Sequence, residues 1–330
     1  MTPLVTTFAG DSARGEGLFS SAGFIRPAVA MYTANQGNNS ISKINLTSFT
    51  STNTLALGAG VGPQWIAIDP IGQFGYVACP YNNTLKRIDL TTFTVSATLS
   101  MPASSYPVSA VVDPTNTSIY TANQTNATVS KISVASFTVV SSLTLSGTVS
   151  TITINPAGTL LYVGYGTGPY LQTITVSTFA TATAYTYGAS GTVNQIAISP
   201  NNDYLYGAYG NASSQSGYTR FNIGTSTYSG FAGGFGDYDY GVAIDPAGTY
   251  AFITRNSISD LKRYPIAGGA ATTTSLPQLG GAICIDTTGT NGYLYYTNFN
   301  QIQKFTCSTL ALSTTLTTTT GNATTCLVIA

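Results

Sequence analysis

One phrase recurs along most of this 330-residue chain. It first appears over Tyr32–Phe49 as YTANQGNNSISKINLTSF, and close copies begin at Tyr76 and Tyr120. Seven anchor aromatics mark the copies at intervals of 41–46 residues: Tyr32, Tyr76, Tyr120, Tyr162, Tyr206, Phe252 and Tyr293. A period of this length predicts a repeat architecture in which each unit buries its apolar face only against its neighbours.

Each anchor from the second onward is preceded, seven residues earlier, by the start of a tight turn. The turns are Asp69–Gly72, Asp113–Asn116, Asn155–Gly158, Ser199–Asn202, Asp245–Gly248 and Asp286–Gly289. Asp, Asn or Ser at the first position accepts hydrogen bonds from the turn backbone, proline presets φ at the second, and Gly or Asn tolerates a positive φ at the fourth. The pattern therefore predicts a hairpin in each repeat.

Four short strands fit into each period. A buried run such as residues 65–69 (WIAID) precedes the turn, and the anchor strand follows it. A third strand such as 41–46 (ISKINL) and a fourth such as 51–57 (STNTLAL) complete the unit. Four antiparallel strands in about 44 residues are typical of one blade of a β-propeller.

The two ends of the repeat region complement each other. The repeats start on a second strand at residue 27, and residues 324–330 (TTCLVIA) have the character of a first strand. We therefore expect the C-terminal strand to complete the N-terminal blade as its innermost strand, which leaves no open sheet edge. The predicted fold is an all-β, seven-bladed β-propeller over residues 27–330, with residues 1–26 as a separate N-terminal arm.

The YTAN and YVAC anchors, the Asp-Pro-x-Gly turns and the SKINL and KRIDL strands resemble the YVTN-type β-propeller repeat. The resemblance covers residues 27–330 and implies the fold. Proteins with this repeat are similar both to surface-layer proteins and to lactonase-like propellers, so the resemblance does not choose a function.

Composition excludes several kinds of function. Only 7% of residues are charged, against about 25% in typical globular chains, and the formal net charge is zero. A neutral chain lacks the positive field that nucleic acid requires. There is no histidine, which removes the commonest general base and metal ligand. We expect no metal, no cofactor, no insertion into a membrane and no enzymatic activity.

The N-terminal arm admits two interpretations. It is either a flexible leader or a docking arm that attaches the propeller to a partner. The residues that would anchor such an arm are Phe8, Arg14, Leu18, Phe19 and Phe24. Its Ser-Ala-Arg-Gly segment resembles the leaders of some phage structural proteins.

The strongest departure from the repeat is Tyr228–Tyr240, YSGFAGGFGDYDY, in the connection that enters the sixth blade. Aromatic rings beside carboxylates suit a sugar ring, which stacks on one face and donates hydroxyls to acids. The candidate ligand-binding residues are Tyr228, Phe231, Phe235, Asp237, Tyr238, Asp239 and Tyr240. The alternative is that the rings pack between blades while the glycines form a long turn.

Six of the eleven lysines and arginines fall at one position of the repeat. Alignment of the third strands brings together Lys43, Arg87, Lys131, Thr173, Arg220, Arg263 and Lys304. A ring of cations suits an anionic ligand. The alternative, which a position that repeats with the architecture favours, is that each cation braces the blades by binding carbonyl groups. Four cysteines show no metal or redox spacing, and we interpret them as free thiols.

The sequence favours a non-enzymatic structural and adhesion protein of a virion surface, such as a phage tail, fibre or capsid-surface protein. It would dock onto other virion proteins through residues 1–26 and present its loops to a host glycan or protein. The composition is of an external type, yet the N-terminus has no recognisable export signal, and a virus leaves by lysis. The alternatives are a cellular surface-layer or adhesion propeller and, less favoured, a lactonase-like enzyme.

Overall fold

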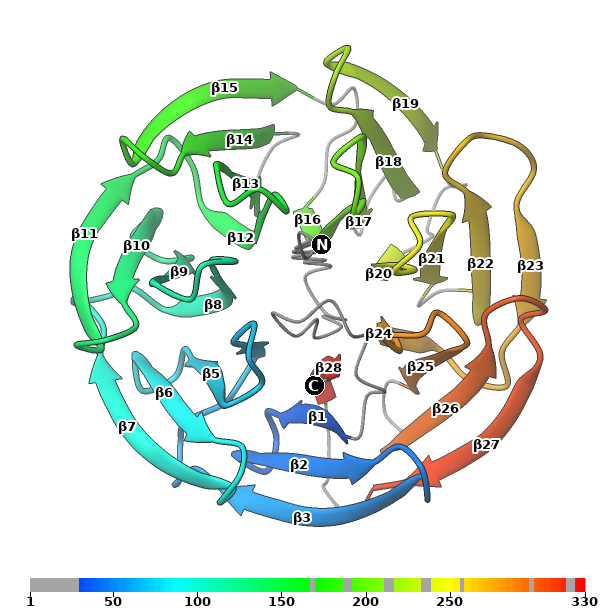
Figure 1. Cartoon of the computed structure of the whole chain (residues 1–330), viewed down its shortest axis with the longest axis horizontal. Helices are drawn as coiled ribbons and strands as arrows, with labels where there is room; N and C mark the ends of the chain where they lie inside the picture. Colours follow the sequence, from blue (N-terminus) through cyan, green and yellow to red (C-terminus); the bar gives the residue numbers. More distant parts are fainter. Residues whose placement is uncertain are drawn as a thin grey trace, which may run out of the picture.

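A computed structural model of the chain describes residues 30–166, 170–186, 192–210, 217–232, 239–255, 258–296, 300–318 and 324–329. These residues form seven separate four-stranded antiparallel sheets arranged as the blades of a ring (Figure 1). The predicted all-β, seven-bladed propeller is confirmed. The predicted docking arm, residues 1–26, lies outside the described residues. Nowhere in the described ranges is there a helix long and apolar enough to cross a membrane.

We number the blades in chain order and give their strands from the innermost outward. Blade 1 consists of β28 (Thr324–Ile329), β1 (Ala30–Asn35), β2 (Ser40–Asn45) and β3 (Thr50–Ala56). Blade 2 consists of β4 (Trp65–Ile68), β5 (Phe74–Cys79), β6 (Thr84–Asp89) and β7 (Thr94–Ser100). Blade 3 consists of β8 (Pro107–Val112), β9 (Ser118–Asn123), β10 (Thr128–Ser133) and β11 (Thr138–Thr144).

The other four blades follow the same order. Blade 4 consists of β12 (Val149–Ile154), β13 (Leu160–Tyr165), β14 (Tyr170–Thr175) and β15 (Ala180–Thr186). Blade 5 consists of β16 (Thr192–Ile198), β17 (Tyr204–Gly210), β18 (Gly217–Asn222) and β19 (Thr227–Ala232). Blade 6 consists of β20 (Asp239–Ile244), β21 (Tyr250–Arg255), β22 (Asp260–Pro265) and β23 (Thr272–Ser275). Blade 7 consists of β24 (Gly280–Ile285), β25 (Asn291–Tyr296), β26 (Gln301–Thr306) and β27 (Leu312–Thr317).

The ring is closed by the C-terminal strand, as the sequence predicts. β28 pairs antiparallel with β1, so that Met31 lies opposite Ile329 and Thr33 lies opposite Leu327. Figure 1 shows β28, in red, beside the blue β1 near the centre of the ring. Blade 1 is thus built from both ends of the repeat region, and folding of the ring requires the two ends to meet.

Connections alternate between two edges of the ring, because successive strands of a blade run in opposite directions. One edge carries the turns between first and second strands and the corners between third and fourth strands; we call it the turn edge. The opposite edge carries the turns between second and third strands and the connections from one blade to the next; we call it the loop edge. Any ligand that binds an end of the ring meets one of these two sets of connections.

Side-chain hydrogen bonds fix the turns of the turn edge. Oδ1 of Asp69 accepts from the backbone N–H groups of Gln73 and Phe74 at 2.7 and 3.1 Å. Asn155 Oδ1 and Ser199 Oγ accept the corresponding pairs of N–H groups in blades 4 and 5. Because this residue closes the turn, the first strand of blade 2 ends at Ile68, one residue earlier than the sequence predicts.

Burial falls from the centre of the ring to its rim. β4 and β8 are buried along their whole length, whereas side chains of the fourth strands β3 and β7 are largely exposed. The rim strands are rich in threonine and serine, for example TSTNTLA in β3. Threonine suits an exposed strand, since its β-branched side chain combines high β-propensity with a polar hydroxyl group.

Aromatic pairs join each of four blades to the next around the ring. Each pair consists of an anchor tyrosine and the phenylalanine at the following blade's corner, with ring centroids 5.6–6.1 Å apart: Tyr32–Phe93, Tyr76–Phe137, Tyr120–Phe179 and Tyr293–Phe49. These phenylalanines have φ between 47° and 54°, in the left-handed region that bulky residues rarely adopt. Burial of the ring against the neighbouring blade compensates for this strain.

Replacing Phe93 with alanine is expected to lower the free energy of unfolding by about 3–5 kcal/mol, because it removes a buried ring that joins blades 1 and 2. Urea denaturation followed by circular dichroism measures the change. Ser226 has the same left-handed conformation at the corner of blade 5. Ser226→Gly should alter stability by less than about 1 kcal/mol, since relief of strain offsets the added freedom of the unfolded chain. Equal losses in the two variants would contradict this account.

Two turn aspartates are partly desolvated. Burial raises the pKa of the Asp69 and Asp245 carboxyls, and hydrogen bonds from backbone N–H groups only partly offset it. Since the pKa is higher in the folded state than in the unfolded state, the protonated carboxyl contributes stability at low pH. That contribution is lost as the pH rises through the folded pKa.

Asp245→Asn is therefore expected to be more stable than the wild type at pH 7, because the amide oxygen can accept the N–H groups of Thr249 and Tyr250 without burying a charge. The difference should close as the pH falls below the folded pKa of Asp245. Urea denaturation at pH 7 and pH 3 tests both statements. Asn155→Asp, the reverse change at the equivalent turn, should lose stability at pH 7. Lower stability of Asp245→Asn at pH 7 would refute the prediction.

Candidate functional site

Three of the six repeated cations bind the backbone of the next blade. Lys43 Nζ donates to the carbonyl oxygen of Leu90 at 3.2 Å, and Arg220 Nη2 donates to that of Ile266 at 2.5 Å. Arg263 Nη1 donates to the carbonyl oxygen of Cys307 at 2.8 Å and also to that of Ser308. The acceptors Leu90, Ile266 and Cys307 occupy one repeat position. The bracing interpretation is confirmed for these three cations.

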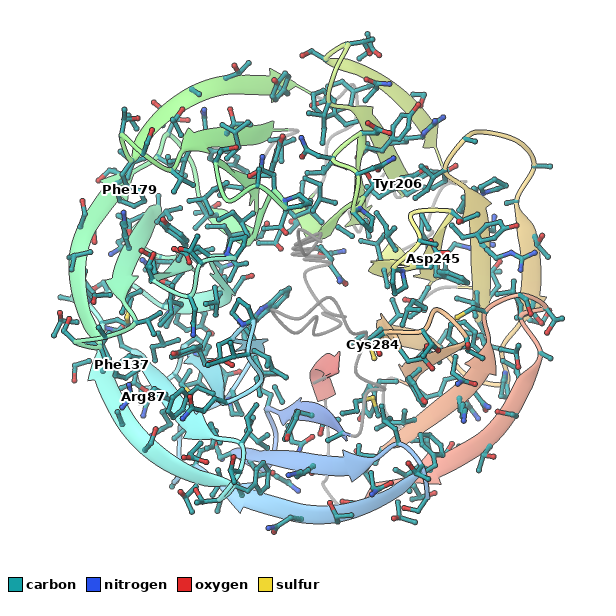
Figure 2. All side chains as sticks on the ribbon, viewed as in Figure 1. Arg87, Phe137, Phe179, Tyr206, Asp245 and Cys284 are labelled. Atoms are coloured by element: carbon teal, nitrogen blue, oxygen red, sulfur yellow. The ribbon has the colours of Figure 1, made fainter. Side chains whose placement is uncertain are left out.

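Cations at this repeat position also lie over aromatic rings at the interface between blades. Lys43 Nζ is 5.8 Å from the ring of Tyr32 and 5.9 Å from that of Phe93. Arg87 lies beside Phe137 of the next blade, where its guanidinium carbon is 5.2 Å from the ring centroid (Figure 2). A cation over a ring face adds about 0.5–2 kcal/mol. These contacts make the position part of the scaffold.

Three of the four cysteines are buried free thiols, as predicted: Cys79, Cys284 and Cys307. Burial raises the pKa of the Cys79 thiol to about 12 and raises that of Cys307 as well. A thiol that stays protonated is a poor nucleophile and metal ligand. Within the described ranges, no three His, Cys, Asp or Glu side chains gather closely enough to hold a metal ion.

The predicted aromatic segment is divided between two strands. Tyr228 and Phe231 belong to β19, and Asp239 and Tyr240 begin β20 at the loop edge. Phe235, Asp237 and Tyr238 lie outside the described residues. The Tyr228 ring packs 4.8 Å from that of Phe221 and 6.5 Å from that of Tyr185. Tyr228 thus contributes to packing against blade 4, and a binding role for all seven residues stays a prediction.

An ion pair lies next to this segment. Arg255 donates from Nε to Asp260 Oδ1 at 2.6 Å, and its Nη2 also contacts Asp260 Oδ2. Both side chains are largely buried where β21 turns into β22 at the loop edge. In the sheet, Asp239 lies opposite Arg255. The predicted acidic residue therefore begins its strand beside an arginine that is already paired.

A second group of aromatic residues lies at the loop edge between blades 2 and 3. Tyr81, in the turn from β5 to β6, is 57% exposed and is the one exposed aromatic among the residues whose burial the structure describes. Tyr106, in the connection from β7 to β8, is half-buried, with its ring centroid 6.1 Å from that of Tyr81. Burial, more than the nearby Tyr81, raises the pKa of the Tyr106 phenol. The Tyr106 side chain therefore remains a neutral hydrogen-bonding group at physiological pH.

Tyr106 has a strained backbone that hydrogen bonds hold in place. Its φ is 55°, although it is bulky and precedes Pro107. Its N–H donates to Asn83 Oδ1 at 2.9 Å, and its carbonyl oxygen accepts from Gln124 N at 3.0 Å. Asn83 also donates through Nδ2 to the carbonyl oxygens of Met101 and Pro102. Strain of this kind costs about 1–3 kcal/mol and is concentrated at functional sites.

Gly62 provides the space that the Tyr81 ring occupies. A Cβ atom at Gly62 would lie 2.3 Å from Cδ2 of Tyr81. Gly62 precedes Pro63 in the connection from blade 1 to blade 2, at the position that Tyr106 holds in the next connection. Both have a φ of 55°. The Tyr81 ring is therefore in close contact with one blade connection and pairs with an aromatic ring on the next.

The sequence contained a signal for this pair that the search for aromatic runs missed. Tyr81 replaces Gly37 and Thr125 of the neighbouring repeats, and Tyr106-Pro107 replaces Gly62-Pro63. Each is a single substitution within a well-kept repeat, and the two are 25 residues apart. Only the fold brings the two tyrosines together.

The arrangement defines the chain as a seven-bladed β-propeller. No protein-family model matches it, and no curated protein does. A solved structure titled "Kuenenia stuttgartiensis Hydrazine Synthase" superposes with a TM-score of 0.74 and 13% sequence identity, covering 89% of this chain and 93% of that chain. A likeness at this identity establishes the shared fold alone.

Replacing Arg263 with methionine is expected to lower the free energy of unfolding by about 1–3 kcal/mol, because two carbonyl groups of blade 7 lose a charged donor. Lys262 is the matched control: it is adjacent in β22 and its side chain points to the opposite face of the blade. Lys262→Met should change stability by less than about 0.5 kcal/mol. Thermal and urea denaturation of both variants measure this, and indistinguishable stabilities would contradict a bracing role.

Proposed function

We propose that this protein is a non-enzymatic structural and adhesion protein of a virion surface, which docks through residues 1–26 and presents its loop edge to a host glycan or protein. The observation that carries the adhesive role is the aromatic pair Tyr81–Tyr106 at the loop edge. An exposed aromatic residue that the fold holds in place contributes strongly to binding while losing little side-chain entropy.

The scaffold positions support a binding role over a catalytic one. The repeated cations Lys43, Arg220 and Arg263 hold adjacent blades together, and turn acids such as Asp69 and Asp245 accept backbone hydrogen bonds. Several of the chain's few charged side chains are thus engaged in holding the scaffold together. A hydroxyl- and amide-rich exterior with ring faces remains available for recognition.

The virion setting draws its support from the leader, whose Ser-Ala-Arg-Gly segment resembles those of phage structural proteins, and from the charge-poor exterior. A cellular surface-layer or adhesion propeller would share the same loop edge. Fractionation of the source culture separates the two. A virion protein is found with purified particles, whereas a surface-layer protein is found with the cell envelope. Recovery from the interior of intact cells, and from neither fraction, would refute both.

Deletion of residues 1–26 is expected to abolish incorporation into particles and to leave the propeller folded. Incorporation is measured by blotting purified particles, and folding by the thermal midpoint of circular dichroism, which should change by no more than a few degrees. A full-length Phe19→Ala, Phe24→Ala variant provides a control in which the arm is present without two of its apolar anchors. A truncated protein that is unfolded, or that still enters particles, would show that the arm has no separate docking role.

A further inference from the structure

We propose that Tyr81 and Tyr106 form a binding platform for a neutral sugar residue. This inference deepens the proposed adhesive function and rests on it, since it names the ligand class of the loop edge. It concerns the edge between blades 2 and 3, three blades away from the predicted aromatic segment at the entry to blade 6.

The chemistry of the surroundings points to an uncharged ligand. The four stretches that meet here are residues 60–64, 80–84, 101–107 and 124–128, and none contains a charged residue. The polar side chains that are exposed or partly exposed on them are amides and hydroxyls, including Gln64, Asn82, Ser104 and Gln124, and the apolar Pro102 and Ala103 are exposed beside them. An acidic sugar, a phosphate or a charged peptide would lose hydration here without gaining an opposite charge.

Several backbone polar groups at this place are already hydrogen-bonded within the protein. A ligand is therefore recognised mainly by the ring faces and the polar side chains. The N–H and carbonyl of Tyr106 are bonded to Asn83 and Gln124, and the carbonyl of Ser105 accepts from Thr125 N. The carbonyl of Pro102 accepts from both Asn83 and Ser105. A peptide that binds by backbone hydrogen bonds therefore finds these groups engaged. A sugar needs only a ring face for its C–H groups and side-chain amides for its hydroxyls.

The positions of both tyrosines are fixed by the protein itself, without a ligand. Gly62 makes room for the Tyr81 ring, and the Asn83 hydrogen bond holds Tyr106 in its strained conformation. Fixing two rings in advance reduces the entropy lost on binding, which matters for a shallow site that buries little area. The connection needs this φ, since Gly62 has the same value one blade earlier, and at Tyr106 it also places a ring beside Tyr81.

The test begins with an array of immobilised neutral oligosaccharides of glucose, galactose, mannose, rhamnose and N-acetylglucosamine, probed with the full-length protein. Acidic glycans and proline-rich peptides are printed beside them. We expect binding to at least one neutral oligosaccharide. Calorimetry with that oligosaccharide should show that Tyr81→Ala lowers affinity about tenfold or more, whereas Tyr81→Phe retains most of it.

Two matched controls separate the platform from general effects. Ile71, at the turn edge of the same blade, is 58% exposed, so Ile71→Ala removes a similarly exposed apolar side chain and should leave affinity unchanged. Gly62→Ala should weaken binding, because its Cβ displaces the Tyr81 ring. Gly60→Ala imposes a similar backbone strain, with φ at 67°, but its Cβ would meet nothing within 4 Å, so affinity should be retained.

Several outcomes would overturn the proposal. They are a failure to bind any neutral oligosaccharide, binding to acidic glycans or peptides alone, and an unchanged affinity in Tyr81→Ala. If the full-length protein still adheres to host cells in any of these cases, the adhesive function survives and only the platform fails. If adhesion to cells is absent as well, the proposed function fails with it.

Discussion

Each blade has to be joined to the next by side-chain contacts, because the seven blades are separate sheets and no ladder of strand hydrogen bonds continues from one to another. Closure of the ring by β28 on β1 gives every blade two neighbours, so all seven interfaces must form together. The repeat is best understood as a solution to this one constraint. Its most regular positions are those that face the neighbouring blade.

Three kinds of contact seal the interface at different depths. Near the centre, Gln195 exchanges hydrogen bonds with the backbone of Val242 in the next blade. Farther out, the anchor tyrosines pack on the corner phenylalanines, as Tyr32 does on Phe93. Beside those rings, cations such as Arg263 donate to carbonyl groups of the following blade. Gln195, Tyr32 and Arg263 are thus each engaged in holding adjacent blades together.

The fold could be predicted from the sequence because the copies of the repeat can be aligned with one another. Spacing and turn residue types together located the turns, and the Asp69 and Asn155 hydrogen bonds show why those residue types are required. Recurrence of a cation at one position correctly indicated a brace between blades for Lys43, Arg220 and Arg263. The candidate site was harder to predict, because a ligand site is a departure from the repeat. Tyr228 belongs to the predicted binding segment, and the structure shows its ring packed on Phe221 and Tyr185. Tyr81 and Tyr106 attract notice only when the fold brings single substitutions in two repeats together.

We propose that recognition takes place at the loop edge, while the turn edge and the blade interfaces serve the scaffold. Hydroxyl-radical footprinting of the full-length protein, free and bound to cells of the source culture, tests it most directly, since oxidation is read residue by residue. We expect oxidation of Tyr81 and Tyr106 to fall on binding, and that of Ile71 at the opposite edge to be unchanged. Protection of Ile71 with Tyr81 still fully reactive would contradict it.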